Sequence, residues 1–159
     1  ETEIANAIYQ YGEERYSRRI AREIIARRRR EASVKTVEDL VEVCKRCVPR
    51  SKNHDIHPAT RTFQALRIVV NDELGALERT LKSAPDWISD QGRLAIISFH
   101  SLEDRIVKNA FRDDPRWNVL TKKPLRPSEE EVLENPRSRS AKLRVAERVP
   151  RSELGSSGR

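Results

Sequence analysis

The chain has 159 residues, 36% hydrophobic and 36% charged, and its 32 Lys and Arg residues against 25 Asp and Glu residues give a net charge of +7. This length is typical of one domain or of two small subdomains, and the positive charge favours polyanionic partners such as nucleic acid. The apolar runs are too short for a membrane span, and no signal-peptide pattern opens the chain. Because the sequence contains no Met, we expect it to be processed or cut from a longer protein.

The first thirty residues carry apolar stripes at helical spacing. One stripe covers residues 4–8, and a second covers residues 16–25 after Gly12. These spacings predict two amphipathic helices. The second helix runs into four arginines at residues 27–30. Such a run is usually a solvated face or a helix C-terminus, so by itself it is only weak support for RNA binding.

A third helix is predicted over residues 37–48. Thr36 and Asp39 fit a capping box at its start, and Pro49 ends it. The sequence thus predicts a helix with a well-defined beginning and end.

The only two cysteines, Cys44 and Cys47, form one C-x-x-C pair near the end of that helix. They fit half of a zinc site completed by His54 and His57, a redox dithiol, or two buried helix residues in a reducing compartment. Because no second C-x-x-C exists and no strand precedes the pair, we expect the third interpretation and no metal site.

A long helix is predicted from Pro58 to about Lys82, and His57, Thr60 and Arg61 crowd its beginning. Free amides at a helix start favour an anion such as phosphate, and Arg61 can add a forked donor. Alternatively, His57 caps the helix and Arg61 pairs with a local carboxylate. Spacing leaves both interpretations open.

The second half alternates between strands and helices. Residues 93–99 predict a strand buried on both faces, and residues 117–121 and 142–147 predict two further strands. We expect a helix opened by a capping box from Ser101 to Asp104 and a short acidic helix capped by Ser128. This order is typical of the closing portion of a larger α/β sheet, whose first strand would here have an open edge.

Polar side chains follow the first of these strands, where ligands of open α/β sheets bind. They are Ser98, His100 and Ser101. A hydrolase triad is not favoured, because no Gly-x-Ser-x-Gly elbow surrounds either serine. Before the last strand, Arg137 and Arg139 lie in a segment of Arg and Ser residues that can bind phosphates. A disordered basic tail has the same composition.

Several motifs resemble the MraW/RsmH family. They are HPATRTFQALRI at residues 57–68, VNDEL at 70–74, IISFHSLEDR at 96–105 and NPRSRS at 135–140, with YGEER at 11–15 as an entry segment. The similarity runs from about residue 2 to residue 148 in the family's order. Members are S-adenosylmethionine-dependent methyltransferases that modify the N4 amino group of a cytidine in the decoding region of small-subunit (16S) ribosomal RNA.

The resemblance implies an α/β fold, namely the C-terminal part of a class I (Rossmann-like) methyltransferase sheet with an inserted all-helical substrate-recognition subdomain. We expect residues 1–84 to form that subdomain and the long helix returning to the sheet. Residues 85–149 then form the strands and helix of the methyltransferase domain, and residues 150–159 a disordered basic tail.

The family's glycine-rich cofactor loop precedes the matched region, and the five glycines include no Gly-x-Gly. The resemblance therefore implies that S-adenosylmethionine binds mainly upstream, that this chain holds no cofactor-binding residue, and that the isolated chain is inactive. We expect His100 to form a polar wall of the reacting site and take it as the candidate catalytic residue. The expected RNA contacts are His57, Thr60, Arg61, Ser98, Ser101, Arg137 and Arg139.

The implied partner is small-subunit ribosomal RNA or the 30S particle, with no membrane. The implied location is the bacterial cytoplasm, or an organelle stroma or matrix if a transit peptide has been lost. A non-catalytic RNA-binding or ribosome-assembly module is the alternative, because the charge of +7 suits it equally well.

Overall fold

The computed structural model describes residues 1–30, 33–49 and 56–154. The chain divides into two compact units, a helical unit, Glu1–Glu73, and a sheet unit, Leu74–Arg159. The mixed α/β class is confirmed. The units divide before the boundary that we expected after residue 84, because the predicted long helix is interrupted. None of the described helices has the length and apolar character needed to cross a membrane.

The described part of the helical unit contains the helices α1 (Thr2–Gly12), α2 (Ser17–Arg29), α3 (Val37–Cys47) and α4 (Thr60–Asn71). Their apolar stripes meet in one core, in which Ile8, Ile20 and Val43 are fully buried. The capping box at the start of α3 is confirmed, since the Thr36 hydroxyl accepts from the Asp39 amide and the Asp39 carboxylate accepts from the Thr36 amide. The helical periodicity of the first half therefore predicted α1, α2 and α3 correctly.

The single helix predicted from Pro58 to Lys82 is wrong. Helix α4 ends at Asn71, Asp72 takes a left-handed conformation with φ 48°, and α5 (Glu73–Trp87) follows. The Asp72 amide donates back to the Ile68 and Val69 carbonyls, which closes α4. A short polar residue tolerates this conformation better than most, so the chain breaks its helix here without a glycine.

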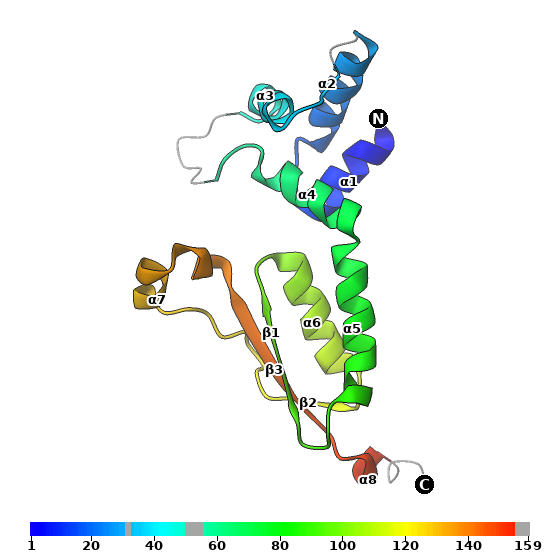
Figure 1. Ribbon diagram of the computed structural model, residues 1–159, viewed down its shortest axis with the longest axis vertical. Helices are drawn as coiled ribbons and strands as arrows, with labels where there is room; N and C mark the ends of the chain where they lie inside the picture. Colours follow the sequence, from blue (N-terminus) through cyan, green and yellow to red (C-terminus); the bar gives the residue numbers. More distant parts are fainter. Residues whose placement is uncertain (31–32, 50–55, 155–159) are drawn as a thin grey trace. The chain divides into compact units, whose positions relative to one another are not determined.

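The described strands of the sheet unit lie in the order β1 (Arg93–Ser98), β3 (Lys142–Arg148) and β2 (Trp117–Val119). Both outer strands are antiparallel to β3, so β1 and β2 run in the same direction and α6 (Ser101–Asp113) connects them (Figure 1). A helix α7 (Glu129–Glu134) and a short 3-10 helix η1 (Pro136–Ser140) precede β3. The described elements fit the predicted closing portion of an α/β sheet.

The prediction that β1 is buried on both faces is wrong. Its residues alternate, with Leu94 and Ile96 packed into the core and Ile97 57% exposed. Helices α5 and α6 both pack on the same sheet face, since their side chains share a core with Ala146 of β3. Among the described strands β1 pairs with β3 alone, which confirms the expected open edge.

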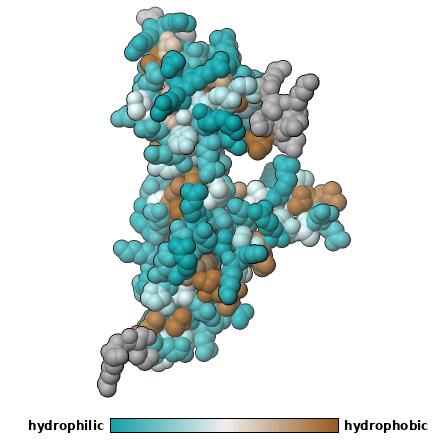
Figure 2. Space-filling model, turned by 180° about the vertical axis from the view of Figure 1, so that it is seen from behind, coloured by the Kyte–Doolittle hydropathy of each residue, from teal (hydrophilic) through white to brown (hydrophobic). Residues whose placement is uncertain are grey.

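The face drawn in Figure 2 is mostly hydrophilic, and hydrophobic side chains show there in small patches, one of them over α7, where Leu133 is 81% exposed. The tail that we expected to be disordered from residue 150 begins with a helix, α8 (Arg151–Leu154). The Arg151 amide donates to the Asp90 carboxylate and so fixes the start of α8. The last residues, 155–159, lie outside the described part.

Candidate functional site

One end of the sheet unit gathers five of the residues selected from the sequence. Ser98 ends β1 and lies opposite Lys142, the first residue of β3. Helix α6 starts directly after β1, and η1, which carries two arginines, directly precedes β3. We call this set the sheet-end cluster. Its members are Ser98, His100, Ser101, Arg137 and Arg139.

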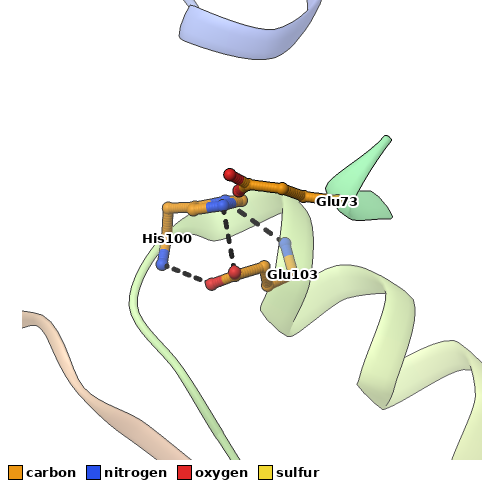
Figure 3. A group of neighbouring side chains, drawn as sticks. All are labelled: Glu73, His100 and Glu103. Atoms are coloured by element: carbon orange, nitrogen blue, oxygen red, sulfur yellow. Dashed lines mark hydrogen bonds and ion pairs between the residues drawn. The ribbon is translucent and has the colours of Figure 1, made fainter. Parts of the chain in front are cut away.

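His100 caps α6. Its Nδ1 accepts from the Glu103 amide at 3.4 Å, and the Glu103 carboxylate accepts from the His100 amide at 3.3 Å (Figure 3). The same carboxylate also accepts from the Phe99 amide at 2.9 Å. The predicted cap, Ser101, is instead the first residue of α6. That prediction is wrong by one position, because a histidine nitrogen serves as the acceptor that a serine hydroxyl usually supplies.

The imidazole of His100 is held on both sides by Glu103. Its Nε2 lies 3.3 Å from Glu103 Oε1, and its side chain is 10% exposed. Burial raises the pKa of Glu103, but hydrogen bonds from His100 and the Phe99 amide outweigh it, so the pKa lies below its ordinary value. Glu103 is therefore a carboxylate at neutral pH, and His100 is positioned by it. The catalytic role of His100 stays a prediction.

Asp104 ties the first turn of α6 to β3. Its carboxylate accepts from Arg144 Nε at 2.7 Å and from Arg144 Nη2 at 3.2 Å, and Lys142 Nζ lies 3.9 Å away. The Arg144 guanidinium lowers the pKa of Asp104. Sequence reasoning assigned Asp104 to a capping box and so missed this ion pair, which holds the first turn of α6, and with it the sheet-end cluster, against β3.

The two serines of the cluster are unequal. Ser98 is 2% exposed, and its hydroxyl donates to the Lys142 carbonyl at 3.4 Å, so it stabilises the end of the strand pair. Ser101 is half-buried at the start of α6. A direct RNA contact from either serine stays a prediction.

Arg137 and Arg139 are both exposed on η1, whereas Ser138 between them is buried. Neither arginine forms an ion pair with a residue that the structure describes. Two guanidinium groups without carboxylate partners are suited to bind an anion such as phosphate.

In the helical unit, His57, Thr60 and Arg61 lie together at the start of α4, and all three are exposed. His57 Nδ1 accepts from the Ala59 amide at 3.2 Å, and the His57 carbonyl accepts from Thr60. His57 thus orders the turn before α4, but the prediction that it caps the helix is wrong, because the N-cap is Ala59 and no side chain bonds there. The other half of that interpretation is also wrong, since Arg61 Nη1 donates to the Glu13 carbonyl at 3.1 Å and pairs with no carboxylate among the described residues.

The C-x-x-C pair is structural. Cys44 and Cys47 are free thiols on α3, exposed by 0% and 4%, and burial raises the pKa of both. A reactive dithiol needs a lowered pKa and access to solvent, which these thiols lack. Of the histidines proposed to complete a zinc site, His57 is exposed and turned to its own backbone, and His54 lies outside the described residues.

Both thiols are expected to react with a thiol reagent at least about tenfold more slowly in the native chain than in urea, because burial suppresses both access and the thiolate form. Absorbance from a chromogenic disulfide reagent measures both rates. Fast reaction of one thiol in the native chain would contradict the structural assignment.

A sequence model of the MraW methylase family matches residues 1–149. A Rhodopirellula baltica protein named ribosomal RNA small subunit methyltransferase H is 74% identical over 149 residues, which cover 94% of this chain and 46% of that protein. A Synechococcus elongatus protein of the same name is 61% identical over 150 residues, or 94% of this chain and 49% of that protein. The chain thus spans about half the length of the curated relatives it matches.

Proposed function

Since the chain belongs to the MraW methylase family, we propose that it forms part of an enzyme that methylates small-subunit ribosomal RNA. The identity of 74% to the Rhodopirellula baltica methyltransferase is the observation that carries this proposal. The finer proposal is that the acceptor is the N4 amino group of a cytidine in the decoding region. We further propose the 30S particle as partner and, because the relatives are bacterial, the bacterial cytoplasm as location.

Each unit supplies a surface for RNA. In the helical unit, Arg61 is exposed beside His57 and Thr60 at the start of α4. In the sheet unit, Arg137 and Arg139 of the sheet-end cluster are exposed on η1. We assign phosphate contacts to these three arginines, because exposed guanidinium groups without carboxylate partners bind phosphate in a bidentate manner.

This proposal places the other members of the sheet-end cluster next to the bound RNA. They are Ser98, His100 and Ser101. His100 has its Nδ1 and Nε2 next to the amide and carboxylate of Glu103. Because both nitrogens face Glu103, a contact with a polar group of the RNA base, like proton abstraction, would require the release of His100 from this cap.

S-adenosylmethionine would supply the methyl group as an electrophilic sulfonium. The described residues do not fit a site for it on their own. Gly12 packs against the Arg61 carbonyl, Gly92 packs against Ser89, and Gly75 lies within α5, so no described glycine belongs to an open loop that could hold the ribose or the methionine part of the cofactor. We therefore propose that the cofactor is held mainly by residues outside this chain.

A chimera tests the proposal. The upstream half of the Rhodopirellula baltica relative is fused to this chain, and the product is incubated with S-adenosylmethionine and unmethylated 30S particles. Nucleoside mass spectrometry is expected to detect N4-methylcytidine with the chimera and none with this chain alone. Methylation by the chain alone would contradict the placement of the cofactor, and RNA binding without methylation by the chimera would favour an assembly module.

Removal of Arg137 and Arg139 together, as Arg137→Ala with Arg139→Ala, is expected to weaken RNA binding by the chain about tenfold and to reduce its salt slope by about two, since two phosphate contacts are lost. The measurement is a titration by fluorescence anisotropy at several salt concentrations. The control, Lys82→Ala with Arg151→Ala, removes the same charge from exposed positions near the other end of β3. Equal effects of both pairs would assign the loss to net charge alone.

A further inference from the structure

A cavity of about 290 Å³ lies within the helical unit, between the turn that joins α1 to α2, the end of α3 and the segment before α4. Three segments far apart in the sequence thus form its wall. Its described lining consists of Glu14, Arg15, Tyr16, Val48, Pro49, Ile56, His57, Pro58 and Arg61. A carboxylate, two guanidinium groups and an apolar wall therefore surround one space.

Glu14 is the unusual member of this lining. It is 4% exposed, and its Oε1 accepts from the Tyr16 amide at 2.9 Å. Among the described residues this is the only hydrogen bond to its carboxylate, and no cation pairs with it. A buried carboxylate with unused acceptor sites is costly, so its presence in the wall of a cavity points to a donor that arrives with a ligand.

Arg15 and Arg61 supply the positive charge. Arg15 is exposed and forms no ion pair with a described residue, and Arg61 is held by the Glu13 carbonyl at 3.1 Å. Arg61 therefore keeps one position at the rim while several of its N–H donors stay available. Two such groups at one rim match a phosphate.

The rest of the lining is apolar or aromatic. Val48, Pro49, Ile56 and Pro58 contribute carbon surface, and the half-buried Tyr16 contributes a ring that packs on the helical core. Unpaired bases are bound in this way, with their faces against apolar or aromatic side chains and their edges hydrogen-bonded.

We propose that this cavity binds one unpaired nucleotide of the RNA substrate, whose base carries an exocyclic amino group. The amino group donates to the Glu14 carboxylate, the base lies against Tyr16 and the apolar wall, and the phosphate binds Arg15 and Arg61. This inference rests on the proposed function only in taking RNA as the ligand. It adds Glu14, Arg15 and Tyr16 to the residues that recognise the substrate.

The base preference of the chain tests the role of Glu14. Short single-stranded oligocytidylate is expected to bind about fivefold more tightly than oligouridylate, because uracil presents a carbonyl where cytosine presents its amino group. Glu14→Gln is expected to bring this ratio close to one, since an amide donates as well as accepts. Fluorescence anisotropy measures both affinities, and thermal unfolding confirms that the variant is folded. A ratio that Glu14→Gln leaves unchanged would overturn the proposal.

Arg15 provides a second variant that does not endanger the fold, because its side chain is exposed. Arg15→Ala is expected to weaken binding of both oligonucleotides about tenfold and to lower the salt slope by about one. The control is Arg18→Ala, which removes the same charge from an exposed position of α2 outside the cavity lining. An equal loss with Arg18→Ala would overturn the assignment.

The chimera separates this inference from the proposed function. If the chimera methylates RNA while Glu14→Gln and Arg15→Ala bind normally, the cavity inference fails and the enzyme proposal stands. If the chimera is inactive while both variants lose binding as expected, the cavity is an RNA site and the enzyme proposal fails.

Discussion

Replacement of Asp104 by asparagine is expected to lower the free energy of unfolding by about 3 kcal/mol, because it leaves a buried guanidinium without its counter-charge. The Arg144 side chain is 6% exposed, and both of its bonds to Asp104 join α6 to β3. Urea unfolding followed by circular dichroism measures the loss. The control is Asp113→Asn, whose carboxylate pairs with Arg112 and is 60% exposed. Because exposed ion pairs contribute little, this control should cost far less than Asp104→Asn.

The pH dependence of that loss has a definite sign. The folded-state pKa of Asp104 is lowered by Arg144. A lowered pKa contributes stability above the unfolded-state value of about 3.9, and this contribution disappears as the pH falls through the folded-state pKa. The stability difference between the native chain and Asp104→Asn should therefore be full near neutral pH and shrink in acid. A difference that is constant from neutral pH into acid would show that the carboxylate charge is not its source.

The same aspartate shows where sequence reasoning about the site reaches its limit. His100 with Glu103 and Ser101 with Asp104 have the same spacing, and either pair fits the start of a helix. The choice depends on Arg144, forty positions along the chain, which binds Asp104 and leaves the cap to His100. Local pattern predicted that a cap exists here, but only the tertiary contact determines which residue forms it.

In the fold, too, local pattern predicted some elements correctly, and tertiary contacts determined the rest. Apolar periodicity predicted the first three helices and β3, because each of them buries one stripe or one face. Apolar periodicity missed the break at Asp72, where the chain takes a left-handed conformation. In the sequence, this aspartate looks like any exposed residue of a helix. Apolar periodicity also assigned two buried faces to β1, because an apolar run does not reveal that α5 and α6 cover the same side of the sheet.

The cavity in the helical unit could not be predicted at all. Glu14 and Arg15 belong to a recognisable motif, yet their partners in the wall begin at Val48. The packing of the helical unit brings these segments together, and the residue spacing around Glu14 does not indicate that they meet. By contrast, Arg61 was selected from the sequence because the first turn of a helix exposes donors to an anion regardless of what packs around it.

Gly12→Ala is expected to destabilise the helical unit by about 2 to 3 kcal/mol. The same substitution at an ordinary glycine inside a helix stabilises the protein instead. Gly12 lies where α1 packs against α4, and a Cβ there would overlap the Arg61 carbonyl oxygen and lie 3.2 Å from Ala65 Cβ. The obstacle is backbone, which cannot rotate away, so the two helices must separate. Gly75→Ala is the control, because Gly75 lies inside α5 with a negative φ.

The two variants should therefore move the unfolding midpoint in opposite directions, with Gly75→Ala stabilising by up to about 1 kcal/mol through its higher helix propensity. Gly12→Ala should also weaken RNA binding, because the displaced α4 carries Arg61 away from the Glu13 carbonyl that holds it. Thermal unfolding and anisotropy on the same samples measure both effects. A stabilised Gly12→Ala chain with normal RNA affinity would mean that α1 and α4 do not approach as closely in solution as Gly12 permits.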